Sequence, residues 1–424
     1  MQFKRKVLPN GLRLITVPMP SLESVTVIVM VGAGSRYENK KNNGISHFFE
    51  HMAFKGTEKR PSAMEISSLI DGMGGEFNAF TGKEITGYYI KSAKGRVETL
   101  LDLLSDMLQN SKLDPAEIEK ERGVIMEEIN MIEDNPMRKL GDLYEELLYG
   151  DSPMGWDIAG PKENIQIISQ QDFRDYMGGL YSADNMTVVI AGGIESGPTE
   201  ALVEKYFSGM KQFATGKPLP LVENQTTPAV LIKPKKTEQI HIALGVRTVP
   251  LSSPKRYPLS VLAAILGGGM SSRLFHEVRE KRGLAYYIRT NSDEYTDAGT
   301  LVSTAGIDPK RVVEAIEVIL SEYSKVAQGK MELSDKELTK AKEFLKGHLV
   351  LGLEDSNSVA GFYGHQELLE DKVDNPDEIM KHLDQVTKED VEAVGREFFT
   401  EKTLNLALIG NFEDRAKLES LLKL

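Results

Sequence analysis

Hydrophobic and polar positions follow two different periods along the chain. Short runs rich in β-branched residues, such as Ser24–Val31 and Ile240–Val246, predict strands, and longer segments with apolar residues three or four positions apart predict helices. The turn Asn10-Gly11 separates two such runs and predicts a hairpin, because both of its residues tolerate positive φ. Strands and helices come in runs rather than in strict alternation. The pattern therefore predicts an α+β fold, with helices packed on one face of a mainly antiparallel sheet.

The order of predicted elements is similar in the two halves of the chain. Residues 214–228 lack apolar periodicity and carry three prolines, which predicts an extended linker. A strand that closes on Gly192 has a counterpart that closes on Gly410, and a strand, turn and amphipathic helix recur at a similar offset. We therefore expect two homologous domains, 1–213 and 229–424, joined by this linker.

A short predicted helix with the sequence HFFEH carries the candidate chemistry. At about 100° per residue, His47, Glu50 and His51 fall on one face, whereas Phe48 and Phe49 lie on the opposite face. Two histidines four positions apart can bind one metal ion, and the glutamate between them is suited to act as a general base on water. The alternative is a polar helix face without chemistry. With only 7 histidines in the chain, such a pairing by chance is rare.

A second predicted helix, residues 114–136, can supply the third protein ligand that a catalytic zinc site needs. Its apolar stripe at heptad spacing consists of Ile118, Ile125 and Ile132. Glu121 and Glu128 occupy the remaining positions of this stripe. Because a buried carboxylate without a partner is costly, we predict that Glu128 is the third metal ligand.

Two neighbouring glutamates have different expected roles. Glu121, one heptad before Glu128, is a candidate for orienting a metal-binding histidine from outside the ligand set, and an ordinary salt bridge to Lys or Arg is the alternative. Glu127 lies one position off the stripe, so it is expected to face solvent, and it is the fallback ligand. We expect one zinc ion per chain, with manganese or cobalt as possible substitutes for this type of ligand set.

Composition narrows the class of function. The chain has no cysteine, so any metal must be held by histidine and carboxylate side chains. The 63 acidic and 51 basic residues give a net charge of −12, which argues against nucleic acid as a partner. No apolar run is long enough for a membrane span or a secretory signal, so we expect a cytoplasmic protein without a membrane partner.

The segments that carry these residues resemble a known peptidase family. HFFEH, its continuation HMAFKGT, and ERGVIMEEI are similar to the inverzincin metallopeptidases of the pitrilysin, insulin-degrading enzyme and mitochondrial processing peptidase family. In that family the third ligand follows the second histidine by about 75 to 77 positions. Glu128 follows His51 by 77 positions (128 − 51). The resemblance implies a zinc endopeptidase or oligopeptidase that acts on short or unfolded peptides, and the chain length resembles the two-domain, bacterial processing-peptidase-like branch.

The resemblance also implies where a peptide binds. GGEFNAFTGKEITGYY is similar to the family's edge strand, which places Asn78, Ala79 and Phe80 beside a peptide held by strand addition. GGGMSSRLFHEVREKRGLAYYI is similar to the segment with a substrate-binding arginine and tyrosine. Arg279 with Tyr286 is the best fit, and Arg282 is the alternative arginine. The alternatives without a binding role are an edge strand covered by its neighbours, solvated helix charges for the two arginines, and a core position for Tyr286.

The second domain is expected to lack the metal ligands. At an offset of 213 positions, Ser260, Ala263 and Ala264 stand opposite the two histidines and the glutamate of HFFEH. The resemblance implies a catalytic domain and a degenerate, substrate-binding domain that enclose a chamber. It also implies a homodimer, or a heterodimer with a related subunit. A noncatalytic assembly subunit and a different metal hydrolase remain the alternative functions.

Overall fold

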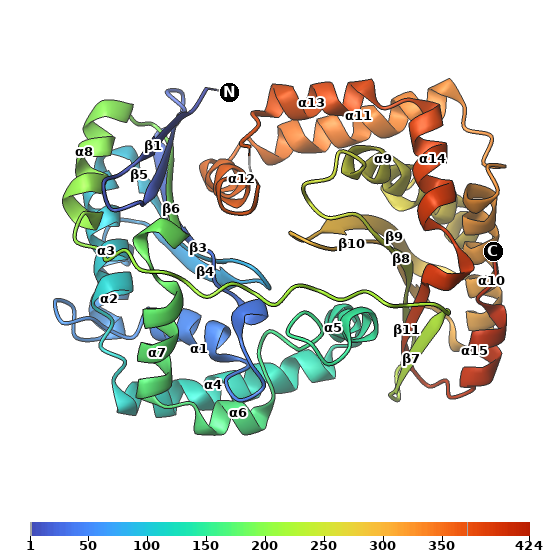
Figure 1. The fold of residues 1–424 in the computed structure, drawn as a ribbon, viewed down its shortest axis with the longest axis horizontal. Helices are drawn as coiled ribbons and strands as arrows, with labels where there is room; N and C mark the ends of the chain where they lie inside the picture. Colours follow the sequence, from blue (N-terminus) through green and yellow to red (C-terminus); the bar gives the residue numbers. More distant parts are fainter. Residues whose placement is uncertain (1, 371) are drawn as a thin grey trace. The chain divides into compact units, whose positions relative to one another are not determined.

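The computed structural model describes residues 2–370 and 372–424 and divides into two compact units (Figure 1). The first unit consists of Met1–Asn130, Trp156–Leu219 and Leu351–Asn375. The second unit consists of Met131–Gly155, Pro220–Val350 and Pro376–Leu424. Each unit therefore takes segments from both halves of the sequence.

The first unit is built on a six-stranded sheet with the order β1-β2-β6-β3-β5-β4. Its strands are β1 (Lys4–Val7), β2 (Arg13–Pro18), β3 (Ser24–Val31), β4 (Glu76–Thr81), β5 (Thr86–Ala93) and β6 (Met186–Gly192). Only β2 and β6 run parallel, and β1 and β2 form the predicted hairpin. The extent of β3 agrees with the strand predicted from its apolar run.

The second unit repeats this sheet without the first strand. Its order is β7-β11-β8-β10-β9, and the single parallel pair is β7 with β11. The strands are β7 (Ala229–Pro234), β8 (Ile240–Thr248), β9 (Ala285–Glu294), β10 (Gly299–Ile307) and β11 (Leu404–Gly410). The matching pairings confirm the prediction of two homologous α+β domains with mainly antiparallel sheets.

Helices of the first unit bury their apolar residues against one face of its sheet. They are α1 (Ile45–Met52), α2 (Ala63–Asp71), α3 (Val97–Gln109), most of α4 (Pro115–Asp134), α6 (Lys162–Ile167), α7 (Gln170–Leu180) and α8 (Ser196–Phe207). In the second unit the corresponding helices are α9 (Arg256–Gly267), α10 (Val312–Ala327), α11 (Asp335–Gly352, up to Val350), α13 (Pro376–Gln385), α14 (Lys388–Phe398) and α15 (Arg415–Leu421). Each unit thus has its own core between one sheet face and this helical layer.

One further helix covers the other face of each sheet, and it comes from the other half of the sequence. In the first unit this helix is α12 (Ser356–Leu369) (Figure 1). Its Glu367 accepts two hydrogen bonds from Arg5, at 2.7 and 2.8 Å. In the second unit it is α5 (Pro136–Tyr149), whose Tyr144 packs against the bare backbone of Gly245. The unit boundary at Leu219 lies inside the predicted linker 214–228. The prediction of continuous domains does not include this exchange of helices.

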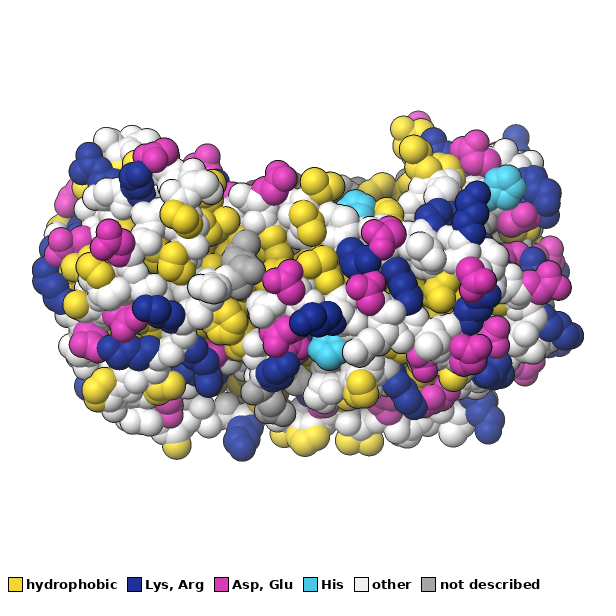
Figure 2. Space-filling view, turned by 90° about the horizontal axis from the view of Figure 1, so that it is seen from above, with side chains coloured by type: hydrophobic (Ala, Val, Ile, Leu, Met, Phe, Trp, Pro, Cys, Tyr) yellow, Lys and Arg dark blue, Asp and Glu magenta, His cyan; other side chains and the backbone are white. Residues whose placement is uncertain are grey.

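Basic and acidic side chains are intermixed on the face shown in Figure 2. No helix within residues 2–370 and 372–424 combines the length and the apolar character needed to cross a bilayer.

Candidate metal centre

Helix α1 presents one apolar face and one chemical face. Phe48, Phe49 and Met52 are fully buried in the core of the first unit, as the predicted helical pattern requires. His47 and His51 lie on the opposite face with Nε2 atoms directed toward α4. The helix starts directly after Gly44, at φ +102°, where a Cβ atom would lie 2.7 Å from the carbonyl oxygen of Ala159. Glycine is therefore required at the start of this helix.

Helix α4 brings two carboxylates to α1. It buries Ile118 and Ile125, whereas Ile132, the last member of the predicted stripe, is only half-buried. Glu121 is buried and Glu128 is half-buried on the same side of α4. Both carboxylates contact histidines of α1.

His47, His51 and Glu128 converge on one point. The Nε2 atoms of His47 and of His51 each lie 3.5 Å from Oε2 of Glu128, and one ligand atom from each residue lies within 4.8 Å of the other two. Two ligand atoms that each bind a tetrahedral zinc ion at about 2.1 Å are separated by about 3.4 Å. The set of donors and their spacing therefore fit zinc. No other group of three such residues is found in the part of the chain that the structure describes.

Glu121 contacts both a histidine and a lysine. Its Oε2 lies 3.1 Å from Nδ1 of His51, and its Oε1 lies 2.5 Å from Nζ of Lys55. When the ring of His51 is neutral, a hydrogen bond from Nδ1–H to the carboxylate of Glu121 leaves the lone pair of Nε2 directed toward the cluster. The two roles considered for Glu121 therefore coexist in one geometry. Glu127 is exposed, accepts a hydrogen bond from Asn130 at 3.3 Å and lies outside the cluster.

The carboxylate of Glu50 is held by a residue that the sequence did not single out. Oγ1 of Thr81, at the end of β4, donates a hydrogen bond of 2.6 Å to Oε2 of Glu50. Burial raises the pKa of Glu50, although the hydrogen bond from Thr81 and the charge of His51 oppose this shift. Such an environment favours proton uptake by a general base. In the sequence, Thr81 is marked only by its position directly after Phe80, one of the predicted peptide-binding residues.

The two histidines differ in their affinity for protons. Burial, together with the nearby charge of His51, lowers the pKa of His47 to about 4 although Glu128 opposes the shift. Burial also acts to lower the pKa of His51, but hydrogen bonds to Glu121 and Glu128 outweigh it and raise this pKa to about 9. Near neutral pH, the metal-free protein therefore carries one neutral and one protonated imidazole at the centre.

Zinc binding near neutral pH should release about one proton per ion, because Nε2 of His51 must lose its proton before it can bind a metal. Protons compete with zinc at this atom, so the apparent zinc affinity should rise with pH and level off only above the pKa of His51, which is about 9. Calorimetric titrations in buffers with different ionisation enthalpies measure the number of protons released. Zinc binding without proton release, at an affinity independent of pH, would contradict this prediction.

The predicted peptide-binding residues lie on the edge strand β4. Among the described residues, β4 pairs only with β5, in the register Asn78↔Tyr89, Ala79↔Tyr88 and Phe80↔Gly87. Exposure alternates along β4, and Asn78 and Phe80 lie on its exposed face. The ring of Phe80 occupies the space where a Cβ atom of Gly87 would lie. An edge of this kind can accept a further strand, as peptide binding by strand addition requires. The role of these three residues in binding a peptide stays a prediction.

Arg279 and Tyr286 lie next to each other in the second unit. Arg279 lies on a π-helical turn, Phe275–Glu280. Its guanidinium carbon is 5.5 Å from the ring centroid of Tyr286. Tyr286 is 73% exposed and therefore not a core residue. Arg282 forms an ion pair with Glu277 and also donates a hydrogen bond to its carbonyl oxygen at 2.8 Å. Arg279 is thus the arginine that is stacked with Tyr286.

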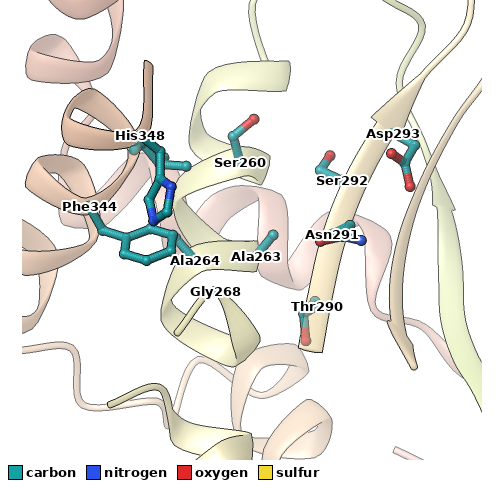
Figure 3. Close-up of a pocket in the computed structure, with 11 residues that line it drawn as sticks. Ser260, Ala263, Ala264, Gly268, Thr290, Asn291, Ser292, Asp293, Phe344 and His348 are labelled. Carbon is teal, nitrogen blue, oxygen red and sulfur yellow. The ribbon is translucent and has the colours of Figure 1, made fainter. Parts of the chain in front are cut away.

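The second unit has a pocket at the place that corresponds to the metal centre. It has a volume of about 390 Å³ and lies between α9, β9 and α11 (Figure 3). Ser260, Ala263 and Ala264 line it from α9, and His348 lines it from α11. Counted from the first residue of each helix, His348 has the position in α11 that Glu128 has in α4. The short side chains on α9 provide no metal ligand at this place.

Comparisons with known proteins agree with this architecture. Residues 13–162 match Insulinase (Peptidase family M16), and residues 168–345 match the Peptidase M16 inactive domain. An uncharacterized zinc protease of Bacillus subtilis, YmxG, is 38% identical, over 94% of this chain and 96% of that protein. The mitochondrial-processing peptidase subunit beta of Lentinula edodes is 32% identical, over 96% of this chain and 89% of that protein.

Solved structures show the same fold. The crystal structure of a protease from Helicobacter pylori superposes with a TM-score of 0.90 at 25% identity, over 96% of this chain and 99% of that one. A structure from Pseudomonas fluorescens, titled peptidase M16 inactive domain, superposes with a TM-score of 0.87 at 18% identity, over 97% of this chain and 99% of that one. The two sequence matches extend over most of the chain and the YmxG likeness over nearly all of it. The chain belongs to the insulinase family of peptidases, family M16.

Proposed function

We propose that the chain is a zinc metalloendopeptidase that hydrolyses short or unfolded peptides. His47, His51 and Glu128 hold one zinc ion, and Glu50 is the general base. The observation that carries the proposal is the convergence of three ligand atoms within 4.8 Å of one another, at a spacing that fits zinc. Membership of a peptidase family and relatives named zinc proteases support it. Manganese or cobalt can substitute for zinc in such a ligand set.

The residues of the first unit divide the reaction between them. Zinc, when bound, supplies a Lewis acid that polarises the peptide carbonyl and acidifies water. Glu50 accepts the proton of the attacking water and later passes it to the leaving amine. Thr81 fixes the carboxylate of Glu50 through its hydrogen bond of 2.6 Å, and Glu121 fixes the ring of His51. Both contacts hold reacting groups in place before the peptide arrives.

The peptide is proposed to bind as an added strand on β4. Asn78, Ala79 and Phe80 would then contact its backbone, and Arg279 with Tyr286 would bind carbonyl oxygens of the substrate. Strand addition recognises the backbone of the peptide rather than its side chains, so we expect little preference for sequence. Substrates would instead be selected by their size, because the proposed chamber is closed. The free edge of β4 and the exposed ring of Tyr286 support this part of the proposal.

Further features of the proposal rest on likeness. Similarity to a subunit of the mitochondrial-processing peptidase supports a homodimer, or a heterodimer with a related subunit. We place the protein in the cytoplasm, without nucleic acid or membrane as a partner. A noncatalytic subunit of this family would not need the ligand set and the general base, which are both present here. Sedimentation of the purified chain, alone and with a related chain, measures the state of assembly.

Cleavage of a mixture of unstructured peptides by the zinc-loaded protein tests the proposal. Mass spectrometry should detect new termini at many sequences, a chelator should stop their formation, and added zinc should restore it. A zinc-loaded protein that leaves all peptides intact would favour a noncatalytic subunit. Cleavage that persists after complete metal removal would favour another class of hydrolase.

Backbone-methylated peptides test strand addition separately. A peptide with N-methyl groups at alternate positions keeps its side chains but loses the donors that pair with an edge strand. We expect its KM to rise at least tenfold over that of the unmodified peptide, whereas methylation in the other register has little effect. Equal KM values for both registers and for the unmodified peptide would contradict binding on β4.

A further inference from the structure

The start of the metal-binding helix is held by a carboxylate from outside the helix. Gly44, which precedes α1, has no side chain to cap it. Glu38 takes this role from six positions upstream: Oε2 accepts a hydrogen bond from the backbone N–H of Gly44, and Oε1 accepts one from that of Ser46, both at 2.8 Å. Glu38 is only 5% exposed. Two N–H groups at the start of α1, those of Gly44 and Ser46, thus find their acceptor in a buried carboxylate, while the N–H of Ile45 donates to the carbonyl oxygen of Asn42.

The contacts of Glu38 extend into the surrounding unit. Nδ2 of Asn43 donates to Oε2 of Glu38 at 2.8 Å and also to the carbonyl oxygen of Asp157 at 3.1 Å. The hydroxyl of Tyr176 donates to Oγ of Ser46 at 2.8 Å, and α7 is thereby tied to the same helix start. Among the described residues, Glu38 forms hydrogen bonds to these donors and no salt bridge to a cation. Two of these three hydrogen bonds come from backbone N–H groups at the start of α1.

A helix of eight residues needs such an anchor more than a long one does. Two turns form few hydrogen bonds of their own, so the position of α1 depends on what holds its ends and its apolar face. His47 lies in the first turn and His51 in the last, and both must place Nε2 within a few tenths of an ångström to share one ion with Glu128. A small tilt of α1 would move both nitrogens.

We propose that Glu38 is a positioning residue of the metal centre: its carboxylate fixes the start of α1 and thereby sets the affinity for zinc. This inference rests on the proposed zinc site and adds a residue that touches neither metal nor substrate. The bonds from backbone N–H groups to an ionised, buried carboxylate are strong because the acceptor carries a charge.

Glutamine is a sharp test of this role. It has the size of glutamate, but only one of its two terminal atoms accepts hydrogen bonds, whereas both oxygens of Glu38 face N–H donors. Glu38→Gln must therefore direct an NH2 group at an N–H group of the helix start. Burial raises the pKa of Glu38 to about 7, against opposing hydrogen bonds from Ser46, Asn43 and Gly44, so the assay belongs at about pH 8, where the carboxylate is ionised.

The experiment compares Glu38→Gln with Glu367→Gln. Glu367 is a carboxylate of the same unit that is buried to a similar degree, and it lies on α12, where it pairs with Arg5 of β1. Competition with a chromogenic chelator gives the zinc dissociation constant of each variant, and thermal unfolding gives its stability. We expect Glu38→Gln to weaken zinc binding about 10- to 100-fold, the range for residues that orient metal ligands. Glu367→Gln should lower stability with zinc affinity within about twofold of the wild type.

The outcomes distinguish a failure of the proposed zinc site from a failure of the role of Glu38. A wild-type protein that binds no zinc would overturn the proposed function itself. A wild-type protein that binds zinc, with Glu38→Gln binding it equally tightly, would overturn only the role of Glu38, as would equal losses in Glu38→Gln and Glu367→Gln. If Glu38→Gln does not fold, Glu38→Asp replaces it, because it keeps the charge but its shorter side chain withdraws the carboxylate from the N–H groups of Gly44 and Ser46. Unchanged zinc affinity in Glu38→Asp would then overturn the role.

Discussion

Replacing Glu50 with glutamine should reduce kcat for peptide hydrolysis by about 10²- to 10⁴-fold, the contribution of a positioned general base. Glutamine has the shape of glutamate and can still accept the hydrogen bond from Thr81, but it cannot take a proton from water. Because Glu50 is not one of the three residues that converge on the metal position, zinc content should stay at one ion per chain. Steady-state kinetics on an unstructured peptide, with metal analysis of the same sample, measures both quantities.

The retained zinc is the control for this variant. A loss of activity that accompanies a loss of zinc would show damage to the metal centre rather than removal of a base. A zinc-loaded Glu50→Gln protein that keeps more than a tenth of wild-type kcat would contradict the assigned role.

Glu128 and Glu127 form a matched pair on α4, and their replacement by glutamine should have opposite results. Glu128→Gln removes the anionic oxygen that lies 3.5 Å from the Nε2 atoms of both histidines. We expect a loss of zinc affinity greater than the 10- to 100-fold loss typical of residues that only orient a ligand, and loss of activity with it. Glu127→Gln should leave zinc affinity and kcat unchanged, because Glu127 is exposed and outside the cluster. Chelator competition and peptide kinetics on the two variants test this.

Glu121→Gln gives an intermediate reference on the same helix. It removes a charge that contacts His51 and Lys55 without removing a ligand, so its zinc affinity should fall within the 10- to 100-fold range. If Glu128→Gln still bound zinc tightly and Glu127→Gln lost it, the third ligand would be Glu127 and not Glu128.

Local periodicity explains why much of this arrangement can be predicted from the sequence. The two faces of α1 follow from helical geometry alone, and so does the stripe of α4 that brings Glu121 and Glu128 to one side. The hairpin at Asn10-Gly11 follows from turn chemistry. In each case the signal lies within about two turns or one strand of the residue concerned.

Contacts between distant segments leave no such signal. Thr81 reaches Glu50 from a strand, Lys55 shares Glu121 with His51, and Glu38 caps α1 from upstream, and none of these follows from spacing. Whether Glu121 binds a histidine or a lysine could not be decided from the stripe, since the folded chain lets it do both.

The covering of the sheets shows the same limit on a larger scale. An apolar stripe shows that a helix is buried but not which sheet it covers. The exchange of α5 and α12 between the two units therefore cannot be predicted from the apolar pattern of the sequence. The pairing of Arg5 with Glu367 fixes α12 on its sheet only after folding has brought the two residues together.

A crystal structure of the zinc-loaded protein, with anomalous diffraction recorded on both sides of the zinc absorption edge, would locate the ion. We expect one anomalous peak in the first unit, about 2.0–2.2 Å from Nε2 of His47, Nε2 of His51 and a carboxylate oxygen of Glu128. A peak at any other place, or a zinc ion at these histidines with Glu128 turned away into solvent, would contradict the proposed zinc site.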